Sequence, residues 1–588
     1  MLFKELAGVF ELIEREPSRN AMTALLADLF KSATAAESAI ISYMALGCLN
    51  PPYIGTQFNI AEKSLLKVIA RIKGVEIAQV KEDLQNVGDY GLLVAQGGWG
   101  SIVEEPLTIL NVNALLVHIH NISGVGSQEV KEDLVEQLIR SLDSISAKFV
   151  VRIILGKLRL GFSDMTLLDA FSFMTRGDKS LREALENAYN LCADIGFLAS
   201  VIKKDGSVGL EKITIQPGIP IRPAAAERMD DAAAIVAKLG KCVAQPKLDG
   251  FRLQVHIDKT GHEPHIFFFS RNLQDMSSMF PDLKEVALCL PVESAIIEGE
   301  AISYDLQTGS FLPFQETVKR KRKHGIDKVM QDYPLRLYFF DILYLNGDSL
   351  LEQPHTDRRL ALEKLFAGKE VSKQEVMFPI EEVVITSGQL LKSYFEQNIS
   401  AGLEGVVVKR TDAIYQAGKR NFNWIKYKRE ESGSLDDTID CVILGYYLGQ
   451  GKRAAFGIGA LLVGIYNPDM DMFQTIAKIG TGMTDGEWRA QKKECDDIRI
   501  DHKPARVACA KELYPDVWVT PAIVCMIRAD EITLSPLHTA GKSDVSMGFA
   551  LRFPRFMGYR PDKNAEDATT VQEIATLFQH QFDKKKRN

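Results

Sequence analysis

The chain has 588 residues, 46% hydrophobic and 25% charged, a composition typical of globular protein and a length that predicts several domains. No apolar run is long enough to cross a bilayer, and the first residues lack the uncharged core of a signal peptide, so we expect a cytoplasmic protein without membrane contact. The net charge of -7 argues against nucleic-acid affinity spread over the whole surface, and any such site must be local.

Apolar residues recur at helical spacing through the first 200 residues, which predicts an all-helical region. One stripe of this kind runs from Val130 to Leu142. The run at residues 150–161, which contains KLRLG, interleaves cations and glycines with apolar residues. This pattern suits a segment that contacts phosphates. The alternative is a helix-loop-helix segment whose residues serve only to pack two helices together. Glycines and prolines at residues 203–223 then mark the first domain boundary.

The hexapeptide KLDGFR at residues 247–252 is the most informative segment of the chain. Asp249 and Gly250 are a turn signal between two strands, which predicts that Lys247 lies at a strand end and faces a cleft. A lysine amine attacks only when neutral, and burial or a nearby cation such as Arg252 lowers its pKa from about 10.4. The apolar residues that follow at every second position predict a half-buried strand. A surface lysine on an ordinary hairpin is the alternative.

Strands alternate with helices from about residue 224 to 430, and short glycine-rich strands follow, which fits a small β-barrel. The clearest strands of this last region are residues 442–447, 460–466 and 517–519. A cationic run at residues 319–323 has the charge to neutralise several phosphates, although a solvated loop or a localisation signal is the usual explanation of such a run. The basic run at residues 584–587 is expected to be a frayed tail.

Six short motifs occur along the chain in a fixed order. They are KLDGFR at 247–252, SRN at 270–272, EGE at 298–300, YFFD at 338–341, EGVVVK at 404–409 and the lysine-rich segment 420–428. In order and spacing they resemble the nucleotidyl-transfer motifs of ATP-dependent DNA ligases of the archaeal and eukaryotic replicative type. Further segments similar to replicative ligases are residues 313–323, 529–536, 550–556 and 560–563. The resemblance covers nearly the whole chain.

The resemblance implies ATP and Mg²⁺ as cofactors and assigns a role to each site residue. Lys247 is the implied nucleophile, which forms a lysyl-AMP intermediate, and Glu300 and Glu404 are the implied magnesium ligands. The implied ATP-binding residues are Gln245, Arg252, Arg271, Glu300, Phe340, Arg420, Lys426 and Lys428. Phe340 would stack on adenine, Arg271 would contact the ribose or the DNA end, and Lys426, Lys428, Arg560 and Lys563 would orient pyrophosphate.

Some of these residues, and Glu298 beside them, have alternatives. Phe340 lies in an aromatic run that begins at Tyr338, and an aromatic at strand spacing is more often a core residue. Gln245 is in position to read the adenine edge, but many family members have a glutamate there, and a strand residue without ligand contact is equally open. Arg252 is expected to contact the ligand, although it could pair with a structural carboxylate. Glu298 is expected to be a solvated strand residue rather than a metal ligand. Whether ADP or GTP can replace ATP stays open.

The implied fold is multidomain: an all-α DNA-binding domain at residues 1–215, an α+β adenylation domain at 216–432, and an all-β OB-fold domain with a C-terminal helix at 433–588. The last domain would close over the nucleotide and then swing away about a hinge at residues 430–434. The implied partner is nicked double-stranded DNA, and we expect a monomer associated with the nucleoid. Residues 572–578 faintly resemble a clamp-binding peptide, but we predict an amphipathic helix there, so a sliding clamp stays an open partner.

Three alternative functions are weighed against the DNA ligase. An NAD-dependent ligase would be expected to carry clustered cysteines for zinc, whereas the eight cysteines here are scattered and are expected to be reduced core residues. An RNA ligase or capping enzyme would not need about two hundred helical residues ahead of the nucleophile. A nucleic-acid scaffold without activity would be expected to have lost Lys247, Glu300 or Lys426, and all three are present.

Overall fold

The computed structural model describes all residues except 17, 88, 100–104, 157, 159, 230, 306–310, 313–316, 318, 321–325, 368–375, 429–437, 450–452, 454–455, 544 and 588. The chain divides into two units, one of Met1–Ile77 with Val94–Arg429 and the other of Ala78–Leu93 with Glu430–Asn588. Among the described helices, none has the length and apolar character needed to cross a membrane.

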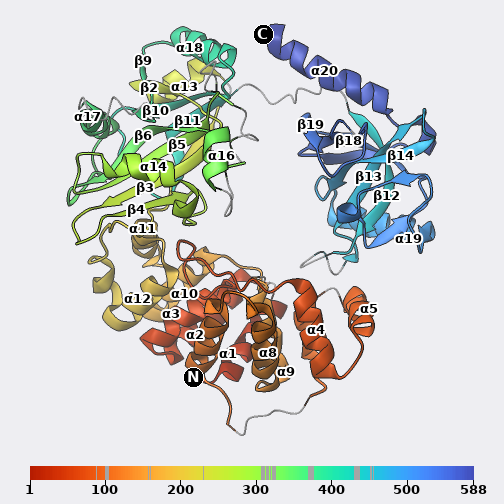
Figure 1. The fold of residues 1–588 in the computed structure, drawn as a ribbon. Helices are drawn as coiled ribbons and strands as arrows, with labels where there is room; N and C mark the ends of the chain where they lie inside the picture. The colour runs from red at the N-terminus through yellow and green to blue at the C-terminus, as the bar shows by residue number, and fades with distance from the viewer. Residues whose placement is uncertain are drawn as a thin grey trace. The chain divides into compact units, whose positions relative to one another are not determined.

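The first 210 residues are helical, which confirms the prediction for this region (Figure 1). The helices are α1 (Phe3–Arg15), α2 (Arg19–Ser32), α3 (Ala35–Ala45), α4 (Glu62–Lys73), α5 (Ile77–Val87), α6 (Tyr90–Ala95), α7 (Ile109–Asn121), α8 (Ser127–Arg140), α9 (Ser144–Ile154), α10 (Asp164–Arg176), α11 (Arg182–Cys192) and α12 (Ile195–Leu210). Aromatic pairs fill the space between helices, with ring centroids 5.4 Å apart for Phe10 and Phe149 and 4.9 Å apart for Phe30 and Phe171.

One detail of the helical prediction is wrong. Val130 on α8 is 49% exposed, whereas Leu138 and Leu142 of the same predicted stripe are buried, together with Val135 and Ile139. Lys131, beside Val130, is buried and donates a hydrogen bond of 2.6 Å to the carbonyl oxygen of Phe58, which satisfies its ammonium group. Sequence periodicity favoured the apolar valine for the buried face and could not anticipate this contact across 73 residues.

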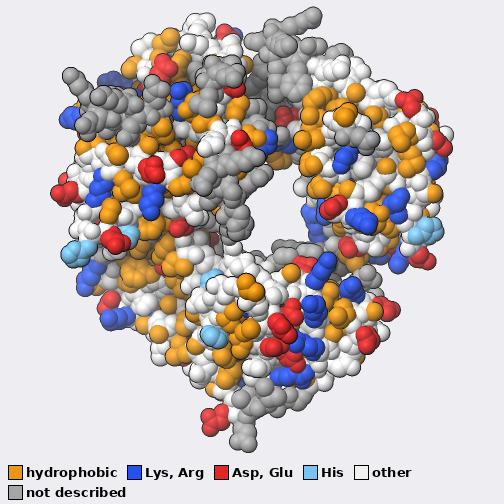
Figure 2. Space-filling view, in the orientation of Figure 1, with side chains coloured by type: hydrophobic (Ala, Val, Ile, Leu, Met, Phe, Trp, Pro, Cys, Tyr) orange, Lys and Arg blue, Asp and Glu red, His pale blue; other side chains and the backbone are white. Residues whose placement is uncertain are grey.

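Acidic and basic side chains are interspersed over the N-terminal helices on the face drawn in Figure 2. Arg71, for example, forms ion pairs with Asp133 and Glu136, with N–O distances of 2.8 and 3.1 Å. Such pairing fits the argument from net charge, because paired surface charges leave little field for nonspecific nucleic-acid binding. Lys157 and Arg159 of the KLRLG run lie outside the described residues.

Two sheets follow in the same unit. The five-stranded sheet has the order β1-β11-β10-β2-β9, and the six-stranded sheet has the order β4-β3-β5-β6-β7 with β8 beside β6. Their strands are β1 (Ala225–Arg228), β2 (Cys242–Pro246), β3 (Phe251–Asp258), β4 (His265–Ser270), β5 (Ser294–Ser303), β6 (Leu335–Leu345), β7 (Asp348–Ser349), β8 (Met377–Pro379), β9 (Val383–Ile385), β10 (Gly405–Arg410) and β11 (Arg420–Lys428). The helices between them are α13 (Ala232–Leu239), α14 (Pro281–Leu288), α16 (Ile326–Asp332), α17 (His355–Phe366) and α18 (Gly388–Ser400), with a 3-10 turn at Ser277–Met279.

The hairpin alternative for the KLDGFR segment is wrong, because β2 and β3 belong to different sheets. The prediction of a half-buried strand after it is also wrong, since β3 is buried on both faces. Its polar residues Gln254 and His256 satisfy one another at 2.9 Å and also bond the backbone of Ile221 and Gly218. Strand β3 can be buried on both faces because the extended segment before β1 supplies hydrogen-bond partners for these two polar side chains.

The second unit contains the predicted β region. Its strands are β12 (Ile439–Tyr447), β13 (Ala460–Asn467), β14 (Met472–Ile479), β15 (Arg499–Ile500), β16 (Val507–Ala508), β17 (Val517–Val519), β18 (Val524–Arg528), β19 (Glu531–Ser535), β20 (Gly548–Arg552) and β21 (Arg555–Tyr559). The helical elements are α19 (Asp485–Asp497), α20 (Val571–Arg587) and 3-10 turns at Lys511–Leu513 and Ala565–Asp567. The three strands predicted from the sequence are confirmed as β12, β13 and β17.

The amphipathic terminal helix is confirmed as α20, because Ile574 is fully buried and Leu577 and Phe578 pack on the same apolar core. The prediction of a frayed tail at residues 584–587 is wrong for the backbone, because α20 continues to Arg587. Five of the eight cysteines are buried as expected, whereas Cys289 is exposed. The hinge segment 430–434 lies outside the described residues.

The cationic run at 319–323 is described only at its first two residues, and the neighbouring residues 313–315 are also outside the described part. Arg320 is buried and its guanidinium lies 2.6 Å from the carboxylate of Asp282. A solvated loop is therefore the wrong description of Arg320. Burial next to a carboxylate also takes this cation out of the set that could neutralise phosphates.

Candidate active site

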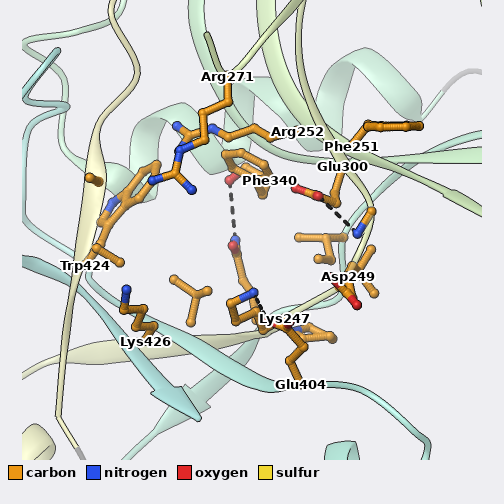
Figure 3. A pocket seen from close by; sticks show the side chains of 18 of the residues that line it. Lys247, Asp249, Phe251, Arg252, Arg271, Glu300, Phe340, Glu404, Trp424 and Lys426 are labelled. Carbon is orange, nitrogen blue, oxygen red and sulfur yellow. Dashed lines mark hydrogen bonds and ion pairs between the residues drawn. The ribbon is translucent and has the colours of Figure 1, made fainter. Parts of the chain in front are cut away.

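A cavity of about 560 Å³ lies between the two sheets of the first unit (Figure 3). Strands β2, β10 and β11 of the five-stranded sheet and β3, β5 and β6 of the six-stranded sheet contribute to its lining. All ten site residues predicted from the sequence line it: Gln245, Lys247, Arg252, Arg271, Glu300, Phe340, Glu404, Arg420, Lys426 and Lys428. Residues spread over almost two hundred positions are thus brought together, while their individual roles stay predictions.

The register of β10 with its two neighbours explains why the lysines face the cavity. Val407 is paired with Gln245 of β2 on one side and with Lys426 of β11 on the other. Because side chains alternate along a strand, residues two positions apart share a face. Lys247 therefore follows Gln245 onto the cavity side, and Lys428 follows Lys426.

Lys247 and Glu404 form an ion pair at one end of the cavity (Figure 3). The Glu404 carboxylate also accepts from the Lys428 amine, at 3.0 Å. Burial raises the pKa of Glu404, but the two lysines outweigh it and hold the pKa below its ordinary value. A single ionised carboxylate is thus held between two amines.

The glycine after Asp249 brings a second carboxylate close to Lys247. The Gly250 amide donates to Glu300 Oε1 at 3.2 Å, and a Cβ atom at Gly250 would lie only 2.3 Å from the Ala301 carbonyl oxygen. Only glycine permits this close approach. Burial raises the pKa of Glu300 to about 7, although the charges of Lys247 and Arg252 lower it.

Arg252 pairs with a structural carboxylate, which confirms one of its two alternatives, while its contact with the ligand stays a prediction. Its guanidinium makes two hydrogen bonds to Glu298, of 2.9 and 3.0 Å, and it also lines the cavity 5.3 Å from the ring centroid of Phe340. Glu298 is 1% exposed and accepts a further hydrogen bond of 2.7 Å from the Tyr415 hydroxyl. The expectation of a solvated Glu298 is therefore wrong, because this carboxylate fixes Arg252.

Cations outnumber carboxylates around the cavity, with seven Lys or Arg against three Asp or Glu in its lining. The pKa of Lys426 is lowered, first by burial and then by the neighbouring cations Arg420, Lys428, Lys247 and Arg271. A concave site with unbalanced positive charge attracts polyanions. The cavity therefore suits a ligand with several phosphates.

Two further groups were not predicted as site residues, Lys409 in the cavity lining and Glu382 behind Gln245. Lys409 of β10 is buried, donates to the Phe340 carbonyl oxygen at 2.7 Å, and has a pKa lowered to about 8 by burial. Glu382, between β8 and β9, accepts a hydrogen bond of 2.8 Å from Gln245 Nε2. Lys409 ends a recognised motif and could have been named, whereas Glu382 lies 137 positions from Gln245, and no local pattern marks it.

The second unit carries the two other cations expected to act on phosphates. Arg560 and Lys563 lie 3.1 and 2.8 Å from the same carboxylate oxygen of Asp440 on β12. Asp440 is itself buried, and its backbone amide donates to the Thr569 hydroxyl. One buried carboxylate thus holds both cations within this unit.

Three family descriptions match successive parts of the chain. Residues 2–172 match "DNA ligase N terminus", residues 223–428 match "ATP dependent DNA ligase domain", and residues 454–563 match "ATP dependent DNA ligase C terminal region".

Similar proteins cover the chain from end to end. A "Probable DNA ligase" of Dictyoglomus turgidum is 46% identical over 587 residues, which is 100% of this chain and 99% of that protein. "DNA ligase 2" of the archaeon Thermofilum pendens is 39% identical over 596 residues, covering 98% and 97% of the two chains. The solved structure Pmar-Lig_PreS3 has a TM-score of 0.55 at 18% identity and covers 94% of this chain and 99% of that one, a likeness in fold.

Proposed function

The chain belongs to the ATP-dependent DNA ligase family, and from this membership we propose how the residues of its cavity divide the work of ligation. The protein seals nicks in duplex DNA during replication, repair and recombination. It joins a 3′-hydroxyl to a 5′-phosphate through a covalent lysyl-AMP intermediate. The observation that carries the proposal is the convergence of Lys247, two carboxylates and a majority of cations in one cavity.

Lys247 is the nucleophile of the first step. Its Nζ loses a proton and forms a bond to the α-phosphorus of ATP, while the bond from that phosphorus to the bridging oxygen breaks and pyrophosphate leaves. In the free protein the amine is paired with the Glu404 carboxylate. The attack therefore requires that this ion pair open, and Lys428 is close enough to keep Glu404 neutralised when it does.

Glu300 and Glu404 are the proposed magnesium ligands. Both offer hard carboxylate oxygens in the same cavity, and the described residues contain no cluster of three or more His, Cys, Asp or Glu side chains that could hold a metal. This donor set fits Mg²⁺, which commonly takes one or two protein carboxylates and completes its shell with phosphate oxygens and water. When bound, the ion would neutralise charge on the phosphate oxygens.

The remaining lining residues orient the nucleotide. Lys426, Lys428 and Arg420 bind the phosphates, and Arg271 contacts the ribose or the DNA end. Phe340 stacks on the adenine face, an interaction that contributes roughly 1 to 3 kcal/mol by analogy with other base–aromatic contacts. The Glu298 pair keeps the guanidinium of Arg252 against the ring of Phe340, which supports a shared role in binding the base and sugar.

We assign the later steps to the whole three-domain chain, divided at residues 1–215, 216–432 and 433–588. In the second step an oxygen of the 5′-phosphate attacks the phosphorus of AMP, and the bond from that phosphorus to Lys247 breaks. In the third step the 3′-hydroxyl attacks the phosphorus of the 5′-phosphate, and AMP leaves. The β region of the second unit is proposed to be an OB fold that brings Arg560 and Lys563 to the pyrophosphate and then moves away. We propose a cytoplasmic, nucleoid-associated monomer that acts on nicked DNA, with a sliding clamp as an additional partner to be tested.

The test is intact-protein mass spectrometry after incubation with Mg²⁺ and either ATP or NAD. We expect one AMP adduct with ATP alone, no adduct in Lys247→Ala, and a normal adduct in Lys241→Ala, an exposed lysine immediately before β2. The protein that carries the AMP adduct should then seal a nicked DNA duplex and release AMP. Charging by NAD alone, or an adduct that survives Lys247→Ala, would contradict the proposal.

A further inference from the structure

The side-chain amide of Gln245 is held in one orientation. Its Nε2 donates to Glu382 Oε2 at 2.8 Å and lies 3.5 Å from the Phe340 carbonyl oxygen. Both neighbours are acceptors, so only the NH₂ end of the amide can face them. Gln245 is 2% exposed, yet none of the described groups donates to its Oε1. The oxygen is therefore available to the cavity that Gln245 lines.

Glu382 is itself fixed. The oxygen that accepts from Gln245 also lies 2.9 Å from Nε2 of His355, which is buried. Burial raises the pKa of Glu382, but the hydrogen bond and charge of His355, with the charges of Lys409 and Arg359, hold the pKa below its ordinary value. Glu382 is thus an ionised acceptor and cannot donate to the Gln245 oxygen.

We propose that Glu382 is a positioning residue for base selection, which fixes the Gln245 amide so that its oxygen accepts from the 6-amino group of adenine. The proposal rests on the proposed function, in which ATP binds this cavity with its base against Phe340. The hydrogen bond between Gln245 and the Phe340 backbone sets the amide beside that ring, and Figure 3 shows Phe340 projecting into the cavity.

The same geometry rejects guanine. Guanine carries a carbonyl oxygen at position 6, so it would meet the Gln245 oxygen with a second acceptor. A free glutamine would adapt by rotating its amide, but rotation here would turn Oε1 toward the Glu382 carboxylate oxygen at 2.8 Å and leave two acceptors in contact. Glu382 thereby gives a neutral glutamine the acceptor-only character that a glutamate would have at this position.

The experiment measures lysyl-AMP and lysyl-GMP formation by the full chain with ATP and with GTP. In Glu382→Ala the amide of Gln245 can rotate, so we expect GTP use to rise and the preference for ATP over GTP to fall about 10- to 100-fold, the effect of one mispaired buried polar group. Glu381→Ala is the matched control, because Glu381 is exposed and adjacent in sequence. Its preference should equal that of the wild type.

A second substitution separates orientation from general damage. A carboxylate presents an acceptor in either rotamer, so Gln245→Glu added to Glu382→Ala should restore the preference for ATP without Glu382. A merely structural Glu382 predicts no such rescue, because the double variant would then combine two defects. Two ATP analogues test the contact in the wild type. Purine riboside triphosphate lacks the 6-amino group and should form the lysyl adduct less well than ATP. Inosine triphosphate carries an oxygen at that position and should form it less well still.

An unchanged ATP-to-GTP ratio in Glu382→Ala, or a loss of both activities in equal proportion with no rescue in the double variant, would overturn the inference. So would wild-type protein that uses inosine triphosphate as well as ATP, a result that requires no variant to fold. Each of these failures is compatible with normal lysyl-AMP formation from ATP by the wild type. Failure of the proposed function is a different result, namely no adduct at Lys247 in the wild type.

Discussion

Glu300 is expected to destabilise the metal-free protein when it is ionised. Its pKa is raised to about 7 from an ordinary value of 4.5, mainly by burial and against the charges of Lys247 and Arg252. Between these two pH values the folded protein binds more protons at this carboxyl than the unfolded chain does, so the free energy of unfolding falls as pH rises through this range. Below pH 4.5 the penalty is absent, and above pH 7 it is complete.

The magnitude follows from the shift. At 1.36 kcal/mol per pKa unit, a rise from 4.5 to about 7 corresponds to ~3 kcal/mol of lost stability at pH 8. Glu300→Gln removes the charge and keeps the shape, and the amide can still accept from Gly250. We therefore expect this variant to be more stable than the wild type at pH 8, by roughly 6–12 °C in the melting temperature of its domain, and nearly equal to it at pH 5.

The assay is thermal unfolding in a chelating buffer at pH 5 and pH 8, with Glu293→Gln as the matched control. Glu293 is exposed and precedes the same strand, so its substitution should leave the pH dependence unchanged. Mg²⁺ with ATP should raise the wild-type melting temperature at pH 8 more than that of Glu300→Gln. A Glu300→Gln variant that is less stable than the wild type at pH 8 would refute the reasoning, because the charges of Lys247 and Arg252 would then outweigh burial.

Three shorter predictions follow from other contacts. Asp440→Asn should slow lysyl-AMP formation about tenfold by loosening Arg560, yet leave sealing of a pre-adenylated nick unchanged, which rapid-quench assays of each step would measure. Tyr415→Phe should lower the free energy of unfolding by about 1–3 kcal/mol in denaturant titrations, because it removes the buried donor to Glu298. Gly250→Ala should reduce adenylation more than tenfold in the mass assay, since its Cβ would meet a carbonyl oxygen at 2.3 Å.

Short motifs were enough to predict the lining of the cavity. The motif residues, Lys247 and Glu404 among them, follow turns and strand ends with a readable local pattern, and the structure brings them together. Glu298 shows the limit, because its neighbours along β5 suggest only a strand, and its burial depends on Arg252 and Tyr415 from two other strands or loops. Local pattern identified the residues and could not identify their contacts.

The same limit applies to elements without motifs. Periodicity in α8 predicts burial of Val130, whereas Val130 is exposed and its neighbour Lys131 is buried, where it donates to the carbonyl oxygen of Phe58. Glu382 had no periodicity or motif to mark it, and its importance comes from a single hydrogen bond to Gln245. Contacts between segments far apart in the chain are tertiary information, which a propensity or a spacing does not contain.

The position of Lys247 between two sheets suits the nucleophilic role proposed for this long, flexible side chain. Only four residues, 247–250, join β2 to β3, and those strands belong to different sheets. The backbone of Lys247 is bonded on one side to Gly405, at 2.9 Å, and Gly250 is bonded on the other to Glu300, at 3.2 Å. The Cα atom is thereby fixed against both halves of the cavity, and only the four-carbon stem of the lysine remains to be oriented. Displacement of either sheet would move the amine relative to the carboxylates, so we expect substitutions that separate the two sheets to slow lysyl-AMP formation.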